Sequence, residues 1–201
     1  REGRAKNSDD RTQMSLLKML ALSPEKSSFI DSLKELNIIP TAISYEYDPC
    51  DYLKAKEFQL KRDDPEFKKS QRDDLLNMEM GILGFKGRVL FRFGKCINDE
   101  LDQISEPDKR IQAEIVASII DRGIHRNYEF FPGNYIAYDL LYNEHRFADK
   151  YTDDDVNHFK TYLQGQIEKI DLESKDIPFL WEKLLEMYSN TLKNHLIAIE
   201  Q

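Results

Sequence analysis

The apolar positions in the first half of the chain follow two different periods. Spacings of three and four residues predict helices over residues 14–22, 24–37, 52–62 and 70–83, the second of them with Ser23 as its N-cap. Alternation of apolar and polar residues predicts a strand over 88–95, and an apolar run predicts another over 38–45. Because proline cannot donate a hydrogen bond to a neighbouring strand, we expect Pro40 near its strand start, at a sheet edge or at a bulge. The helix over 70–83 is expected to cover this sheet.

The pattern changes from Asn98 onward, where every apolar stripe has the helical period. The predicted helices span 107–124, 135–142, 153–170 and 178 to the end of the chain. Their stripes have the width of helices that pack on one another or on a preceding domain. We therefore predict an α/β protein. Residues 1–98 would form a partial sheet flanked by helices, and residues 99–201 a mostly helical extension packed on it.

Composition narrows the class of protein. Of the 201 residues, 40% are hydrophobic and 33% are charged, which is ordinary for a globular domain. A formal net charge of -8 argues against a general nucleic-acid binder, and no apolar run reaches the roughly 18 residues that a transmembrane helix needs. The two cysteines, Cys50 and Cys96, lack metal-ligand spacing. We expect reduced thiols in a cytoplasmic protein, with a disulfide between them as the alternative.

The first residues of the chain gather basic side chains around a glycine. Arg1, Arg4 and Lys6 surround Gly3 and the carboxylate of Glu2, and a predicted helix begins a few residues later. Converging cations and the backbone amides near a helix N-terminus are groups that bind phosphate. The alternative is a solvated loop that ends in a helix N-cap at position 8, 9, 10 or 12, where serine, aspartate or threonine stands.

A second block of sequence adds weight to the phosphate interpretation. Glu2 and Gly3 with nearby cations, followed by a helical passage and then by the proline-containing strand at 38–43, resemble the glycerolipid acyltransferase family, the 1-acylglycerol-phosphate acyltransferase-like proteins. In that family an F-P-E-G-x-R block helps to bind glycerophosphate, and a later hydrophobic-P-hydrophobic block forms a strand of the core sheet. This chain departs from the first block, because Arg1 stands where the family usually has proline and Ala5 where it usually has arginine.

The resemblance implies a fold, an activity and roles for residues. The fold would be an acyltransferase-like core, of which the first domain is the C-terminal part. The activity would move an acyl group from a thioester donor, acyl-CoA or acyl carrier protein, to a hydroxyl of a glycerophosphate-type acceptor, without a metal or redox cofactor. Glu2 would orient the acceptor, and Arg1, Arg4 and Lys6 would supply phosphate ligands beside Gly3. A lipid acceptor also implies transient peripheral contact with the inner face of the membrane, and no particular oligomeric state is implied.

The catalytic motif of that family is absent from this sequence. It is an H-x-x-x-x-D block upstream of the E-G block, in which histidine is the general base and aspartate orients it. The residues five positions after the four histidines are Phe130, Lys150, Leu163 and Glu200. We therefore expect no catalytic residue in this chain, interpret it as the C-terminal part of a longer protein, and expect it to be inactive alone.

Two segments of the predicted sheet are weaker candidates for a site. The residues 45–47 follow the first predicted strand, so that Tyr45, Glu46 and Tyr47 would wall a site in an open α/β sheet or form an exposed loop. Arg88 and Arg92 share one face of the second strand. They would face acidic neighbours, an anion or solvent.

Histidine and aspartate groups in the second half have two interpretations each. His145 with Asp149, and His125 with Glu129, are spaced to meet on a helix and tune a base, or to form surface pairs. The aspartates at 153–155 suggest a metal site, or a helix first turn where carboxylates favour the positive end of the dipole. We favour the surface pairs and the helix start, and predict no metal site.

A different functional class competes with the acyltransferase. The chain could be a non-catalytic helical protein-interaction module in which the E-G segment is only a capped loop. Its signature is an exposed apolar patch on the C-terminal helices and no concavity near Gly3. A phosphohydrolase that uses the aspartate pairs is a third class, and it lacks metal-spaced carboxylates.

Overall fold

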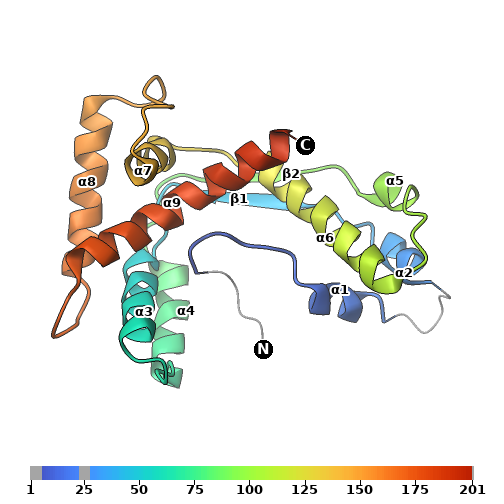
Figure 1. The fold of residues 1–201 in the computed structure, drawn as a ribbon, viewed down its shortest axis with the longest axis horizontal. Helices are drawn as coiled ribbons and strands as arrows, with labels where there is room; N and C mark the ends of the chain where they lie inside the picture. The colour runs from blue at the N-terminus through green and yellow to red at the C-terminus, as the bar shows by residue number, and fades with distance from the viewer. Residues whose placement is uncertain (1–5, 23–27, 201) are drawn as a thin grey trace.

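The computed structural model describes residues 6–22 and 28–200 (Figure 1). Its helices are α1 (Met14–Leu20), α2 (Phe29–Glu35), α3 (Asp51–Asp63), α4 (Gln71–Leu83), α5 (Asn98–Leu101), α6 (Lys109–Arg126), α7 (Pro132–Tyr142), α8 (Asp153–Glu168) and α9 (Ile177–Glu200). The strands are β1 (Thr41–Tyr45) and β2 (Val89–Phe93). A mixed α/β fold with a helical majority is therefore confirmed, as is the change to helices alone after the second strand within residues 98–200.

The helices form two groups with the strands between them (Figure 1). One group consists of α1, α2, α5 and α6, and the other of α3, α4, α7 and α8, while the long helix α9 runs from the second group toward α6. None of the described helices is long and apolar enough to cross a membrane.

The sheet consists of β1 and β2 in antiparallel pairing, with Ile43 opposite Phe91. Pro40 directly precedes β1, and its carbonyl accepts a hydrogen bond from the amide of Gly94 at 2.8 Å. The predicted place of this proline at its strand start is confirmed. Helix α6 reaches the sheet here because Gly123 has no side chain, since a Cβ at that position would meet Cγ of Pro40 at 2.7 Å.

One face of the sheet is largely exposed in the part of the chain that the structure describes. Alternate residues of the two strands share this face, which we call the open sheet face: Thr41, Ile43, Tyr45, Val89, Phe91 and Phe93. Phe91 is 56% exposed and Phe93 is 72% exposed. The opposite face carries Ala42 and Ser44, which are buried.

Local sequence explains where several helices begin. The Oγ of Ser70 accepts a hydrogen bond from the amide of Asp73, and the Asp73 carboxylate accepts one from the Ser70 amide, which together cap α4. Thr152 and Asp155 make the same reciprocal pair at α8. Pro132 stands in the first turn of α7, as expected for a residue that lacks an N–H group.

The second helix starts later than its pattern predicts. It begins at Phe29, where the Oγ of Ser28 accepts a hydrogen bond from the amide of Asp31 at 3.0 Å. The predicted N-cap Ser23 and the proline after it lie outside the described residues. Serine at either position is a suitable cap, so periodicity could not choose between them.

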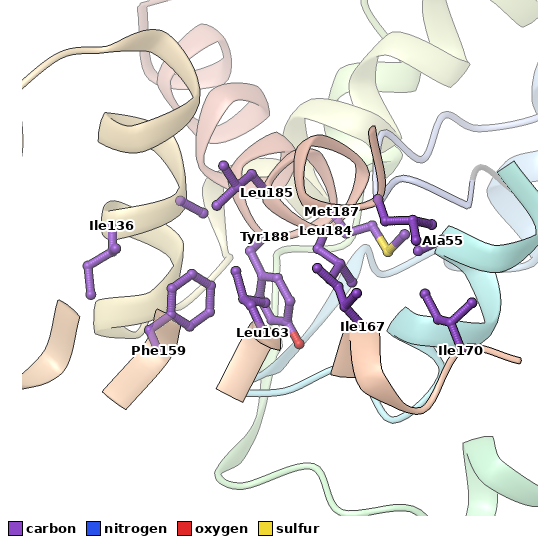
Figure 2. Close-up of a cluster of buried hydrophobic side chains, with 12 residues drawn as sticks. Ala55, Ile136, Phe159, Leu163, Ile167, Ile170, Leu184, Leu185, Met187 and Tyr188 are labelled. Carbon is purple, nitrogen blue, oxygen red and sulfur yellow. The ribbon is translucent and has the colours of Figure 1, made fainter. Parts of the chain in front are cut away.

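The larger hydrophobic cluster surrounds α9, and we call it the α9 cluster. Its buried members are Ala55, Ile136, Ala137, Phe159, Leu163, Ile167, Ile170, Leu180, Leu184, Leu185, Met187 and Tyr188. In Figure 2, Phe159, Leu163 and Ile167 of α8 point toward residues of α9. Four helices and the segment that follows α8 therefore contribute side chains to a single core.

The second cluster surrounds α6, and we call it the α6 cluster. Its buried members are Leu17, Leu33, Ile97, Leu101, Val116, Ala117, Ile119 and Ile120. Both clusters include residues from either side of position 98. The packing of the helical half against the first half is thus observed, while the placement of a domain boundary between residues 98 and 99 stays a prediction.

Helix α4 differs from its prediction, because it does not cover the sheet. No residue of α4 is buried, and the helices with substantial contact to the strands include α6 but not α4. It approaches the start of α3 instead, where the thiol of Cys50 donates a hydrogen bond to the carbonyl of Asn77 at 3.3 Å. Periodicity shows that a helix has an apolar side, but the partner of that side is decided by the rest of the fold.

Candidate functional site

The predicted phosphate ligands fall at the edge of what the structure describes. Arg1, Glu2, Gly3 and Arg4 lie outside the described residues. Lys6 is described, and its ammonium group makes an ion pair with the carboxylate of Glu57 on α3. Lys6 is thus the one predicted phosphate ligand among the described residues, and it pairs with Glu57, which the sequence analysis did not select.

Three lysines converge on Glu57, and we call this group the lysine cluster. Besides Lys6, the Nζ of Lys61 lies 3.0 Å from Oε1 of Glu57, and the Nζ of Lys69 lies 3.7 Å from Oε2. The Glu57 side chain is 7% exposed, whereas those of Lys6, Lys61 and Lys69 are 30%, 52% and 22% exposed. The carboxylate is thus buried beneath three ammonium groups that reach solvent.

The positive charges of the lysine cluster act on one another. Burial, together with the positive charges of Lys61 and Lys69, lowers the pKa of Lys6 to about 8. A lysine whose positive form is disfavoured by its neighbours gains stability when an anion binds beside it. The electrostatics of the cluster are those of a site for a negative group.

The segment after Lys6 is held against α9 by amide side chains. The Nδ2 of Asn190 donates to the carbonyl of Asn7 at 2.8 Å, and the Nδ2 of Asn194 donates to Oδ1 of Asp9 at 3.0 Å. Arg11 donates to Oδ1 of Asn194 at 2.8 Å. Asparagines inside a helix that is otherwise apolar on this side thus fix the course of the N-terminal segment.

These tertiary contacts overturn the predicted helix cap. Helix α1 begins after Gln13, and no side chain makes its cap hydrogen bond. Thr12 instead donates from its amide and its hydroxyl to Oδ1 of Asp121 on α6, at 2.8 and 2.6 Å. The residues suited to capping α1, Thr12 and Asp9 among them, are used to attach the segment to distant helices.

A cavity of about 210 Å³ lies between this segment, β1 and α9, and we call it the β1 pocket. Its lining residues are Ser8, Asp10, Ile43, Ser44, Tyr45, Asp48, Lys54, Tyr128, Glu129, Asn134, Met187, Tyr188 and Thr191. Three carboxylates against one lysine make it acidic, and hydroxyl and amide groups supply further polar contacts. Such a lining suits neutral hydroxyl groups of a ligand better than its phosphate.

The backbone of β1 also faces this pocket. The carbonyl of Pro40 and the amide of Glu46 bond to β2, so the alternate residues between them pair with β2 as well. Ile43 and Tyr45, the residues in between, therefore direct their N–H and C=O groups toward the unpaired edge of β1. Both residues line the pocket.

Only part of the predicted site wall at 45–47 lines this pocket. Tyr45 does, whereas Glu46 binds Arg88 at 2.9 and 3.0 Å, which holds the pKa of Glu46 below its ordinary value. The ring of Tyr47 packs against Tyr162, with 4.4 Å between centroids. The argument from the carboxyl ends of parallel strands does not apply here, because the two strands are antiparallel.

The paired histidines do not form helical pairs. His125 is buried near the end of α6, but Glu129 lies beyond that helix and makes an ion pair with Arg92. His145 and Asp149 lie in the turns that follow α7. Helix α6 ends at Arg126, before Glu129, and α7 ends at Tyr142, before His145, so neither pair meets on a helix to tune a base.

The two strand arginines face acidic neighbours, because Arg88 pairs with Glu46 and Arg92 pairs with Glu129.

The remaining candidates have structural roles. The aspartates at 153–155 occupy the first turn of α8. Within residues 6–22 and 28–200, no group of three or more His, Cys, Asp or Glu side chains could hold a metal ion. Cys50 and Cys96 are free thiols, and burial raises the pKa of Cys50. The alternative of a disulfide is therefore not observed.

Sequence reasoning missed a buried hydrogen-bond network at the start of α3. Asp51 is 0% exposed, and its Oδ2 accepts from the hydroxyls of Tyr162 at 2.8 Å and Tyr188 at 2.7 Å. Its Oδ1 accepts from Nε2 of Gln166 at 2.7 Å and from the amide of Tyr52 at 2.6 Å. Burial raises the pKa of Asp51 to about 6. Since the carboxylate is fully occupied, it joins α3 to α8 and α9 and leaves no lone pair for a ligand.

The network has no local sequence signal, and in the lysine cluster only Glu57 and Lys61 have one, because they are four positions apart on α3. Asp51 and Tyr188 are 137 positions apart, and Glu57 lies 51 positions after Lys6. Comparisons of the chain with protein-family models, curated proteins and solved structures found no match. The site is therefore interpreted from its own chemistry.

Proposed function

We propose that this chain forms the acceptor-binding part of a glycerolipid acyltransferase, which moves an acyl group from acyl-CoA or acyl carrier protein to a hydroxyl of a glycerophosphate-type acceptor. One observation carries the proposal: both sequence blocks of the resemblance lead to the β1 pocket. Ser8 and Asp10 follow the E-G block, Ile43 belongs to the proline-containing block, and all three line the same cavity. Two motifs that matter for one ligand are expected to meet around it.

The chemistry of the site is divided in a way that matches such an acceptor. The β1 pocket offers carboxylates and hydroxyls for the alcohol groups of glycerol, and Lys6 stands two residues before Ser8 at the lysine cluster. In the proposal, Glu2 orients the acceptor and Arg1 and Arg4 add phosphate ligands beside Gly3. No redox step occurs in acyl transfer, so the proposal needs no redox cofactor.

The sequence lacks an H-x-x-x-x-D motif, so the proposed general base is supplied from outside these 201 residues. It would remove the proton of the acceptor hydroxyl as that oxygen attacks the thioester carbonyl, and the C–S bond would then break to release the donor thiolate, which takes up the proton. The chain itself is proposed to be inactive. Access to a lipid acceptor implies transient contact with the inner face of the membrane.

The sheet supports the interpretation of an acyltransferase-like core that is extended by further strands. Among the described residues each strand pairs with one neighbour, and an isolated two-stranded sheet is marginally stable in water. The open sheet face carries exposed Phe91 and Phe93, and the groups of Ile43 and Tyr45 are directed to an unpaired edge. A covering helix would bury the open sheet face, and a further strand beside β2 would extend the sheet while leaving the edge of β1 to the β1 pocket.

The acceptor KM of the longer, catalytically complete protein tests the function. We expect Lys6→Ala together with Arg4→Ala to raise the KM for the glycerophosphate acceptor about tenfold or more, because charge-assisted contacts to phosphate are lost. The KM for the acyl thioester should change little. Lys18→Ala is the control, because Lys18 is exposed on α1.

Unchanged acceptor dependence would remove the proposed role of the N-terminal cations. Acyl transfer by the 201-residue chain at enzyme-like rates would contradict the statement that its catalytic base lies elsewhere.

The competing function, a helical protein-interaction module, is favoured by one observation. Ile82 and Leu83 of α4, with Phe85 after it, are 74%, 75% and 75% exposed. The patch lies on α4 rather than on the C-terminal helices, and a cavity does adjoin the segment after Gly3. A longer protein that contains the histidine motif, shows no acyltransferase activity and binds a protein partner through Leu83 would establish this alternative.

A further inference from the structure

The lysine cluster holds more positive charge than its carboxylate requires. One ammonium group would neutralise Glu57, yet Lys6, Lys61 and Lys69 all contact it. The Nζ of Lys69 also lies 3.0 Å from Asp74, whose side chain is 64% exposed and therefore largely screened by water. Such an accumulation is unusual in a chain whose formal net charge is -8.

The three lysines reach this point from separate parts of the chain. Lys61 stands one turn after Glu57 on α3, Lys69 belongs to the loop between α3 and α4, and Lys6 comes from the N-terminal segment. Two of the three are less than one-third exposed, so their ammonium groups are held near the carboxylate. Glu57 thus fixes the positions of the cations, and their solvent-facing side is left for a ligand.

We propose that Lys61 and Lys69, together with Lys6, bind a phosphate monoester, while the buried carboxylate of Glu57 positions the three ammonium groups. Within the proposed function, on which this identification rests, the ligand is the phosphate of the glycerophosphate acceptor. A phosphate monoester carries about −1.5 to −2 charges at neutral pH, and the three lysines exceed the charge of Glu57 by two and that of Glu57 with Asp74 by one. Its three oxygens can each accept a hydrogen bond from one ammonium group, and lysine commonly binds phosphate in this way.

The proposal adds residues that no motif contains. Lys61, in the last turn of α3, and Lys69, in the loop that follows, lie more than fifty positions after the E-G block. They would place the phosphate beside α3, and Lys54 on the same helix lines the β1 pocket.

Binding of sn-glycerol 3-phosphate to the 201-residue chain tests the proposal by titration calorimetry or by NMR. Inorganic phosphate and glycerol are titrated in parallel, so that recognition of phosphate is separated from recognition of the alcohol. We expect Lys61→Ala and Lys69→Ala each to weaken binding of both phosphates about tenfold, the effect of losing one charge-assisted hydrogen bond. Lys56→Ala is the matched control on α3, because Lys56 does not line the β1 pocket and is not one of the three lysines paired with Glu57.

A second variant probes the role of the carboxylate. Glu57→Gln removes the charge that positions the three ammonium groups, so it should lower stability and weaken binding of inorganic phosphate, and circular dichroism confirms that each variant is folded. Tighter binding would show that Glu57 competes with phosphate and does not position its ligands. Three outcomes would overturn the proposal: no phosphate binding by the unmodified chain at about 10 mM, unchanged binding in both lysine variants, or an equal loss in Lys56→Ala, which would reveal only a general charge effect.

The two proposals fail differently. If the chain binds phosphate through these lysines but the longer protein transfers no acyl group, the phosphate site stands and the acyltransferase assignment falls. If acyl transfer occurs and Lys61→Ala and Lys69→Ala leave the acceptor KM unchanged, the enzyme assignment stands and this site is refuted.

Discussion

Two apolar regions of the molecule differ in what surrounds them. The α9 cluster has side chains at most 4% exposed, whereas Ile82, Leu83 and Phe93, on α4 and the open sheet face, are 72–75% exposed. Both regions are rich in leucine, isoleucine and phenylalanine, so composition does not explain the difference. In the α9 cluster several elements pack around a common centre, and α4 and β2 lack such partners among the described residues. We interpret the first region as a complete core and the second as a surface that the proposed acyltransferase covers with further structure.

The largest expected effect comes from a matched pair of leucine substitutions. Leu184→Ala, at a position that is 0% exposed, should lower the free energy of unfolding by about 4 kcal/mol, because it leaves a cavity in the α9 cluster. Leu83→Ala, at 75% exposure, should change it by less than about 0.5 kcal/mol. Urea denaturation measures both. Similar losses of unfolding free energy at the two positions would show that α4 is packed, and would contradict the difference between the two regions.

Substitution of Asp51, in the hydrogen-bond network beside the α9 cluster, should lower the free energy of unfolding nearly as much. Asp51→Ala leaves Tyr162, Tyr188 and Gln166 with buried donors that have lost their acceptor, and we expect a loss of about 3 kcal/mol. Asp149→Ala, whose side chain is 71% exposed, is the control and should be neutral. A neutral Asp51→Ala would mean that the network does not hold α3 to α8 and α9.

A pH dependence should separate the charge of Asp51 from its hydrogen bonds. Burial raises the pKa of Asp51 to about 6 from an ordinary value of 3.8, so between these pH values the folded chain binds more protons than the unfolded chain. The stabilising contribution is present below pH 3.8 and is lost as pH rises through about 6, with an expected size of about 3 kcal/mol.

Other carboxylates act in the opposite direction, since arginine contacts lower the pKa of Glu46 and Asp176. The measurement is therefore the difference between the parent chain and Asp51→Asn, followed by thermal unfolding from pH 4 to 7. Parallel curves for the two proteins would refute the assignment to Asp51.

The smallest effect on stability should come from the open sheet face. Phe91→Ser with Phe93→Ser should change the free energy of unfolding by less than about 0.5 kcal/mol, because both rings are more than half exposed. The same change should reduce binding of a hydrophobic dye. Phe159→Ser, at 3% exposure, is the control. It should lower the free energy of unfolding and should not reduce dye binding. Undiminished dye binding would show that the apolar surface lies elsewhere.

Parts of the fold and the site were readable in the sequence. The reciprocal cap of Ser70 and Asp73, the position of Pro40 and the helical second half depend on neighbours in the chain, so pattern and propensity suffice. Lys6 was selected as a candidate phosphate ligand for the same reason. Its actual partner, Glu57, could not be predicted, because an ion pair across 51 positions has no local signature.

The misplaced predictions share a physical cause. Thr12 was a suitable helix cap, but the hydrogen bond to Asp121 on α6 competes with capping. Helix α4 has an apolar side, but the sheet was already approached by α6 through the close contact of Gly123 with Pro40. At Thr12 a distant group outweighed a local capping preference of about 1 kcal/mol, and at α4 the rest of the fold decided which helix reaches the sheet.

By itself the sequence determined the type and approximate extent of most elements, the strand that follows Pro40, and the concentration of cations near the start of the chain. Only the tertiary structure decided that three lysines share one buried glutamate, that Asp51 joins three helices, and that one sheet face stays open. Local elements follow from backbone preferences and periodicity, which act over a few residues. The site and the open face follow from packing and electrostatics between groups more than fifty positions apart, which no local pattern records.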